Sequence, residues 1–363
     1  MGENPTCTLT KNRRKRMYKN IFKAAQAGSV NDVRFFIEEK KVKVNAKDKV
    51  NKSTPLQWAV GENSNVDVLK YLIEQGADVN VVGEFFGHTL LHIAALSNPN
   101  VEILRFLIEY GAEIHATKED GETPLHCSAD GHQFNVEVMK CLIEKGAKVT
   151  AEDKNKNTPL HVAAAKQSNV EFVECLIENG AEVDAKNESD KETPLHVAAL
   201  SNTNTEIAQC LIDNGADVNA KGYGGWTPLE LATRDNLNVL KCLIENGADV
   251  NVKYDDGRTP LHSTCGSMSS VAIMECLIVN GADVNAKDNE GKTPLHFLLA
   301  SEGQFNRDMA NRLKCLIKSG ADVNAKNNEG KTPLDCAKAL NEKDLQKKID
   351  ILRKAGGKSA KEL

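Results

Sequence analysis

The chain has 363 residues, of which 40% are apolar and 27% are charged, a balance that suits a folded protein and argues against wholesale disorder. No apolar run approaches the ~20 residues of a bilayer-spanning helix, and the start of the chain lacks the hydrophobic segment of a signal peptide. We therefore expect no membrane contact and a cytoplasmic location.

The N-terminal end is basic, whereas the rest of the chain is acidic. Residues 1–52 hold 14 basic and 5 acidic residues, and the overall net charge is -5. Residues 1–17 are predicted to form a basic arm without regular structure, which contains the run KNRRKR from Lys11 to Arg16. Such a run is typical of a solvated arm, and nuclear import or nucleic-acid binding are the alternatives.

Residues 18–48 show a helix-turn-helix pattern, and from residue 49 onward a short core beginning with threonine recurs. Successive threonines lie 32 to 39 residues apart, which marks a solenoid built from one repeated unit. The core starts at Thr54, Thr89, Thr123, Thr158, Thr193, Thr227, Thr259, Thr293 and Thr332.

Each repeat contains the signals of two helices and a turn. Threonine can cap a helix whose first residue is proline, and a second, amphipathic helix such as VEFVECLIENG follows a polar break. A glycine then ends this helix in the left-handed conformation. The polar stretch that follows, such as ADVNAKDNEGK, predicts a β-hairpin-like finger. The glycines are Gly76, Gly111, Gly146, Gly180, Gly215, Gly247, Gly281 and Gly320.

The stretches DNEGKTPLHFLL and CLIKSGADVNAK resemble the ankyrin repeat, and the resemblance covers roughly residues 18 to 356. It implies an all-α repeat solenoid, in which stacked helix-turn-helix units with β-hairpin-like fingers form a curved superhelix with a concave face. The implied organisation is an N-terminal capping repeat at 18–48, eight repeats at 49–326, a C-terminal capping repeat at 327–356 and a tail at 357–363.

Two departures from the pattern carry expectations of their own. Three fingers have lysine in place of the turn glycine, at Lys52, Lys156 and Lys191, so we expect looser turns there. The segment 299–314 contains extra residues, and it can form either a lengthened helix pair or a protruding loop.

The recurring histidines and cysteines are predicted to be structural. Stacked helices lie ~8 to 10 Å apart, too far for equivalent histidines to share a metal or for equivalent cysteines to form disulfides. The resemblance implies that each histidine links neighbouring repeats by hydrogen bonds, and the cysteines are expected to be small buried apolar residues. No catalytic, cofactor-binding or metal-binding motif stands out, so we expect no enzymatic activity and no cofactor.

The fingers provide the candidate binding residues, because aromatic residues dominate interface hot spots and two fingers concentrate them. The first reads GEFFGH and the second reads GYGGW. We expect them roughly 40 Å apart in one groove with an acidic floor and a change of sign at two arginines. The residues are Phe85, Phe86, His88, Glu119, Asp120, Glu122, Asp190, Glu192, Tyr223, Trp226, Arg234 and Arg258.

The sequence favours a monomeric, non-enzymatic scaffold that binds a partner protein on the concave face of fingers and inner helices. The partner is expected to present basic residues around apolar anchors. Three alternatives stay open: a host-directed effector of an intracellular bacterium that binds in the same way, nucleic-acid or nuclear association through the basic end, and an enzyme without a recognised motif. Under the first alternative the protein would be located in a host cytosol, and under the second it would be located in the nucleus.

Overall fold

The computed structural model describes residues 18–84, 86–130, 135–166, 168–234, 236–267, 270–300, 307–338 and 345–363. Phe85 and the basic run from Lys11 to Arg16 lie outside these residues. The chain divides into two compact units, Met1–Glu182 and Val183–Leu363, here called the N-terminal half and the C-terminal half. Each half is described by itself.

Each half is a row of helix pairs, and the described part of the chain contains five pairs in each half and no strand. The fold is thus the expected all-α repeat solenoid. The first helices are α2 (Ile21–Ala27), α4 (Pro55–Glu62), α6 (Leu90–Ser97), α8 (Pro124–Asp130) and α10 (Pro159–Lys166) in the N-terminal half, then α12 (Pro194–Ser201), α14 (Pro228–Ala232), α16 (Pro260–Gly266), α18 (Pro294–Ala300) and α20 (Pro333–Lys338) in the C-terminal half.

The second helices complete the pairs. They are α3 (Val30–Arg34), which continues into η1 (Phe35–Glu39), α5 (Val66–Glu74), α7 (Val101–Glu109), α9 (Val136–Glu144) and α11 (Glu171–Glu178), then α13 (Thr205–Asp213), α15 (Leu237–Glu245), α17 (Val271–Val279), α19 (Arg307–Lys318) and α21 (Leu345–Lys354). A short 3-10 turn, η2 (Tyr223–Gly225), lies in the finger before α14.

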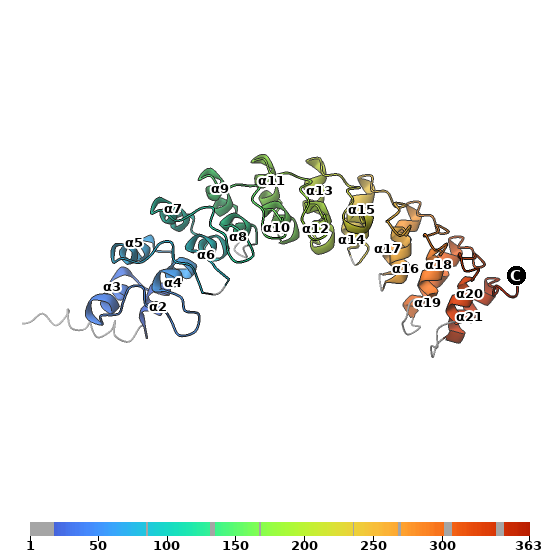
Figure 1. Cartoon of the computed structure of the whole chain (residues 1–363), viewed down its shortest axis with the longest axis horizontal. Helices are drawn as coiled ribbons and strands as arrows, with labels where there is room; N and C mark the ends of the chain where they lie inside the picture. Colours follow the sequence, from blue (N-terminus) through green and yellow to red (C-terminus); the bar gives the residue numbers. More distant parts are fainter. Residues whose placement is uncertain are drawn as a thin grey trace, which may run out of the picture. The chain divides into compact units, whose positions relative to one another are not determined.

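Within each half, first helices pack on the first helices of the neighbouring repeats, and second helices pack on second helices. In the N-terminal half, α4, α6, α8 and α10 follow one another in one row and α5, α7, α9 and α11 in the other (Figure 1). The leucine after the core proline is buried between the rows, for example Leu125 and Leu160. Burial of such a side chain contributes about 1.5 to 3 kcal/mol.

The local signals act as the sequence predicts. Thr54 caps α4 by accepting the Gln57 N–H, and Pro55 takes the first helical position. The eight glycines that were expected to end the second helices all have φ between 89° and 98°. This conformation favours glycine because it has no Cβ, so each second helix stops where its glycine stands.

The asparagine that follows the second-helix glycine by four residues joins its repeat to the next one. The Asn251 side chain donates to Gly281 O at 2.9 Å and accepts the Asp283 N–H at 2.7 Å. The same two bonds recur at Asn80, Asn219, Asn285 and Asn324. These asparagines therefore form a ladder of bonds between adjacent repeats.

The prediction of looser turns is wrong for the Lys156 finger, whereas the Lys52 and Lys191 fingers do close over one residue more than the glycine fingers. Lys52, Lys156 and Lys191 adopt φ values of 56°, 58° and 54°, which lie in the left-handed region that glycine occupies in other fingers. The Lys156 finger also keeps the closing bond of a glycine finger, since Asp153 donates its N–H to Asn157 O at 2.9 Å and Asp288 donates its own to Lys292 O at 3.0 Å. The other two fingers close one residue later, from the Asp48 N–H to Ser53 O and from the Asn187 N–H to Glu192 O, both at 3.0 Å. The lysine backbone accepts a strained conformation because the surrounding hydrogen bonds fix the turn.

Replacing Lys52 by glycine should therefore stabilise the protein by about 0.5 to 1 kcal/mol, because left-handed backbone costs an L-residue about 1 to 2 kcal/mol and the added chain entropy offsets only part of that. Urea unfolding of Lys52→Gly would measure this gain. Lys49→Gly, in the same finger but without a positive φ, is the control and should show none. Equal destabilisation by Lys52→Gly and Lys49→Gly would show that the Lys52 backbone is not strained.

Helix α19, at the end of segment 299–314, is longer than the second helix of the preceding repeat. Helix α19 has 12 residues, whereas α17 has nine, and residues 301–306 lie outside the described part of the chain. Arg312 of α19 is buried and donates to Thr264 O on α16. Arg312 thus places a buried cation against the first helix of the preceding repeat.

The last seven residues pack against the final repeat. Asp335, which replaces the core histidine, accepts the Thr332 N–H at 3.0 Å and the Ala360 N–H at 2.8 Å. Arg353 also pairs with Glu362 at 2.6 Å. Residues 357–363 therefore cover the end of the repeat row in place of a further finger.

Candidate functional site

The core histidines link each repeat to the next one, as predicted. Thr193 donates its N–H to His196 Nδ1 at 3.1 Å, and His196 Nε2 lies 3.2 Å from Trp226 O in the following finger. Because a backbone N–H donates to Nδ1, the ring proton is on Nε2 and is donated to the carbonyl. The same pattern recurs at His92, His126, His262 and His296.

The cysteines of the second helices are buried to different extents. Among the described residues all are free thiols; Cys141, Cys175, Cys210 and Cys242 are buried, whereas Cys276 and Cys315 are half-buried. Burial raises the pKa of the Cys141 and Cys242 thiols, so these groups stay protonated and are poor nucleophiles. The described residues also contain no group of three potential metal ligands.

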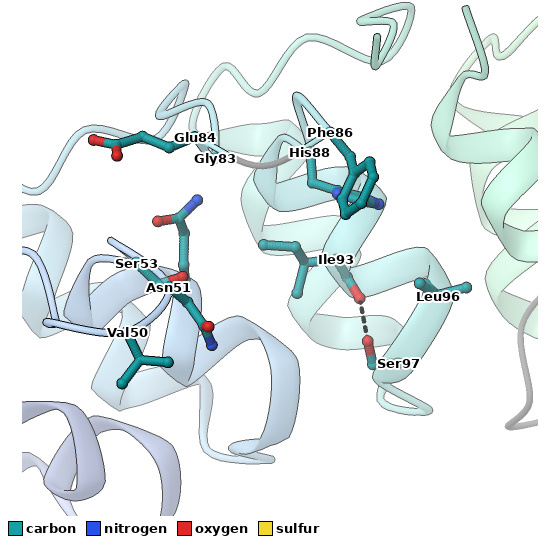
Figure 2. Close-up of a pocket in the computed structure, with 11 residues that line it drawn as sticks. Val50, Asn51, Ser53, Gly83, Glu84, Phe86, His88, Ile93, Leu96 and Ser97 are labelled. Carbon is teal, nitrogen blue, oxygen red and sulfur yellow. Dashed lines mark hydrogen bonds between the residues drawn. The ribbon is translucent and has the colours of Figure 1, made fainter. Parts of the chain in front are cut away.

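A hollow of about 450 Å³, here called the N-terminal hollow, lies beside the first aromatic finger. It is lined by Phe86 and His88 of that finger, by Ile93 and Leu96 of α6, and by Val50 of the preceding finger (Figure 2). Phe86 is 68% exposed and Val50 is 80% exposed. Two large apolar side chains thus flank the hollow with most of their surface open to solvent.

The backbone of Phe86 is strained and held from the next finger. Its φ is 62°, which is unusual for a bulky residue, and its carbonyl accepts the Glu119 N–H at 3.0 Å. The Phe86 and His88 rings meet edge to face with centroids 6.2 Å apart. As at the three finger lysines, the hydrogen bonds of the turn hold this strained backbone in place.

The acidic residues of the finger between α7 and α8 are partly neutralised. Lys118 Nζ lies 2.6 Å from Glu122 and 3.1 Å from Asp120. Only Glu119 of the three predicted carboxylates lies outside this ion-pair cluster, so the finger is less acidic than its sequence indicates.

A second hollow of about 270 Å³, the C-terminal hollow, brings together five of the predicted residues. Tyr223 and Trp226 come from the second aromatic finger, Arg234 follows α14, and the preceding finger supplies the remaining two, Asp190 and Glu192. The Tyr223 N–H donates to Asp190 O at 2.6 Å, which fixes the two fingers against each other. Tyr223 itself is 73% exposed.

The finger can reach this position because of its glycines. Gly224 and Gly225 have φ values of 66° and 76°. A Cβ on Gly225 would also lie 3.3 Å from backbone atoms of the next finger. The pair of glycines therefore permits both the turn that presents Tyr223 and the close approach of the fingers.

The C-terminal hollow is lined by side chains of both charges, the carboxylates of Asp190 and Glu192 and the guanidinium of Arg234. The Arg234 guanidinium lies 5.8 Å from the centre of the Trp226 ring, within the range of a cation–π contact. Burial and the neighbouring Asp190 raise the pKa of Glu192, and Arg234 opposes the rise. A further cation placed here would stabilise the Glu192 carboxylate.

Arg258 lies outside the residues that line this hollow. It pairs with Asp256 at 2.5 Å within its own finger and lies 5.9 Å from the centre of the Phe297 ring. Both predicted arginines thus have carboxylates near them. That the aromatic and charged finger residues bind a partner stays a prediction, and the hollows show which of them lie together.

Several lining residues were not singled out from the sequence. Val50 and Leu96 line the N-terminal hollow, and Leu200 and Leu231 line the C-terminal one. Leu96 and Leu200 occupy the same place in the segment AALSN, which occurs in these two repeats. That shared segment, with a leucine where other repeats have smaller or polar residues, is the signal that could have found Leu96 and Leu200.

The helix pairs, the capped first helices and the bonds between neighbouring repeats define a helical repeat protein. A family model described as ankyrin repeats in three copies matches the chain at residues 21–118, 91–187, 164–254, 235–306 and 261–352. The chain therefore belongs to the ankyrin repeat family. Ankyrin repeats are generally protein–protein interaction modules, and the family is typically non-enzymatic.

The other comparisons add two findings. No curated protein matches the chain. Within the described ranges, no helix has both the length and the apolar composition needed to cross a membrane.

Proposed function

We propose that the chain is a non-enzymatic scaffold that binds a partner protein on its finger face, meaning the fingers and the first helices. The observation that carries this proposal is the pairing of an exposed aromatic fingertip with a hollow, at Phe86 in the N-terminal half and at Tyr223 in the C-terminal half. An aromatic anchor beside a hollow is the usual form of an interface hot spot.

The partner is proposed to present apolar anchors with basic residues beside them. The N-terminal hollow is lined by apolar side chains from two fingers and a helix, so it suits an apolar anchor. The C-terminal hollow contains Asp190 and Glu192 beside two aromatic rings. A lysine or arginine of the partner would pair with these carboxylates and contact the rings.

A role in binding also accounts for the chemistry of the repeated polar residues. The core histidines use both ring nitrogens in bonds within the array, as His196 does with Thr193 and Trp226. The buried thiols have raised pKa values, as at Cys175. These groups support the scaffold, which leaves the finger side chains as the variable surface for recognition.

Truncation of a fingertip should weaken partner binding by about 2 kcal/mol, or roughly 30-fold, if the ring is a hot spot. The test uses a partner identified by pull-down and mass spectrometry, with its affinity for Phe86→Ala, Tyr223→Ala and Trp226→Ala measured by calorimetry. Thermal melts should be nearly unchanged for Phe86→Ala and Tyr223→Ala, because both rings are mostly exposed.

The matched control is Tyr110→Ala, which removes an aromatic ring that is 43% exposed at the end of the second helix α7. It should leave the affinity unchanged. Lost stability together with an unchanged affinity in the fingertip variants would show that the rings belong to the scaffold, and the finger face would then be the wrong site.

A further inference from the structure

We propose a second docking surface, on the second helices α17, α19 and α21, that binds an acidic amphipathic helix of a partner protein. It lies on the row of second helices, whereas the finger face consists of the fingers and the first helices. The proposal does not depend on the function proposed above. We call it the lysine surface, and it consists of two hollows lined by side chains of these three helices.

The sequence of the second helices changes character at this point. The position two residues before the closing glycine or its equivalent is acidic in six consecutive repeats, then becomes valine and finally lysine. In chain order the residues are Glu74, Glu109, Glu144, Glu178, Asp213, Glu245, Val279, Lys318 and Lys354. Val279 is 83% exposed, which makes it the most exposed of the large apolar side chains described. A solvated acidic row thus gives way to an apolar and basic one.

The hollows follow the same helices. One of about 570 Å³ lies between α17 and α19, and one of about 700 Å³ lies between α19 and α21. Lys314 and Lys318 line both of them, so the two hollows are neighbours that share a wall on α19. Half-buried isoleucines contribute to the apolar lining, one from each helix: Ile278, Ile317 and Ile351.

The charge of the surface is positive. Lys314, Lys318, Lys347 and Lys354 line it together with only two carboxylates, Glu275 and Asp350. On α9, in an earlier repeat, the residue equivalent to Lys314 is Lys140, which pairs with Glu137 at 3.1 Å. The residue at the Glu137 position of α19 is Asn311, so Lys314 lacks that partner. Its ammonium group therefore remains available to a carboxylate of a partner.

The shape selects a helix over a membrane surface. The isoleucines are half-buried in the hollows, so a flat bilayer would meet the lysines without reaching them, whereas side chains that project from a helix can enter. Neighbouring second helices are ~10 Å apart, and the two hollows should have a similar spacing. A helix rises 1.5 Å per residue, so apolar residues about seven positions apart would fill both hollows. Acidic residues beside them would face the lysines.

The test uses the full chain and a designed probe, a labelled 18-residue helical peptide with leucines seven positions apart and glutamates beside them. Fluorescence anisotropy should show binding that weakens as salt increases. The double variant Lys314→Glu, Lys318→Glu should weaken it at least tenfold, and Lys314→Gln, Lys318→Gln should have a smaller effect. All four changes are at exposed positions and should leave the circular dichroism spectrum unchanged.

Three controls decide between the sources of binding. Lys241→Glu changes the residue equivalent to Lys314 on α15 and should bind the probe as the wild type does. A scrambled peptide of equal composition should bind at least tenfold more weakly. Vesicles of phosphatidylcholine and phosphatidylserine should not retain the protein through these lysines.

Several results would overturn the proposal: equal binding of the scrambled and ordered peptides, no loss in the double variant, or vesicle binding that depends on Lys314 and Lys318. Self-association lost in the double variant would also overturn it, by making a second copy of the chain the occupant. The fingertip variants Phe86→Ala and Tyr223→Ala should bind the peptide normally, so failure of the finger-face proposal would be seen separately.

Discussion

Acidification from pH 7 to pH 4 is expected to lower the free energy of unfolding by several kcal/mol. The main cause is the row of core histidines. Burial lowers the pKa of His92 and of His196 to about 4, because the charged ring would lose its hydration inside the repeat. Burial also lowers the pKa of His126, His262 and His296.

The direction follows from where the protons bind. The unfolded chain takes up protons on these histidines near pH 6.5, whereas the folded chain takes them up only near pH 4 at His92 and His196. Stability is therefore fully present above pH 6.5, falls between pH 6.5 and pH 4, and loses no more from these two groups at lower pH. For shifts of this size the loss is roughly 3 kcal/mol per histidine.

Urea unfolding at pH 7.5, 5.5 and 4.5 would measure the effect, and His196→Gln would test its source. Glutamine already occupies this position in one repeat, where Gln57 Oε1 accepts the Thr54 N–H at 2.9 Å. The variant should therefore fold, and its stability should change less with pH than that of the wild type. An unchanged pH dependence in the variant would show that other groups control acid unfolding.

Replacing Glu230 by glutamine should stabilise the protein at pH 8 by roughly 2 to 3 kcal/mol. Glu230 takes the place of the core histidine in its repeat, and its carboxylate accepts a bond from the buried Tyr254 hydroxyl at 2.6 Å. Burial raises the pKa of Glu230 to about 7, although bonds from Tyr254 and Ser263 oppose the rise. A glutamine oxygen can still accept the Tyr254 hydroxyl, and it carries no charge.

The pH dependence of this gain has the opposite sign to that of the histidines. The unfolded carboxyl loses its proton near pH 4.5 and the folded one near pH 7, so the wild type loses stability as the pH rises through this window. The variant and the wild type should thus be nearly equal at pH 4.5 and differ most at pH 8. Chemical unfolding at both pH values would measure this, with the exposed Glu206→Gln as the control. A variant that loses stability at pH 8 would show that Tyr254 requires the charged acceptor.

The helices and their ends could be predicted from the sequence because their signals are local. Threonine, proline and the closing glycine each act within one turn of the chain, as at Thr54 and Gly76. The turn at Lys52 could not be predicted in the same way, since its left-handed backbone is imposed by the bonds that the Asn51 and Ser53 N–H groups donate to the Asp48 carboxylate. Local propensity alone favours another conformation there.

The candidate site was less predictable because it depends on side-chain placement between repeats. The aromatic fingers were visible in the sequence, but the ion pairs of Lys118 and the cation–π contact of Arg234 with Trp226 depend on rotamers that only the fold sets. The change from glutamate to lysine along the second helices is readable in the sequence. It becomes meaningful only once α17, α19 and α21 are known to lie side by side.

The asparagine ladder has a consequence for how such a chain can vary over generations. The Asn251 and Asn285 side chains each bond the backbone of the following repeat. Every junction between two repeats therefore uses the same pair of hydrogen bonds, and these bonds involve only the two repeats that meet there. Duplication or deletion of one whole repeat would remake an equivalent junction from residues already present. Array length can therefore change by whole units, while the side chains of the fingertips and of the second-helix surfaces can change without altering these junctions.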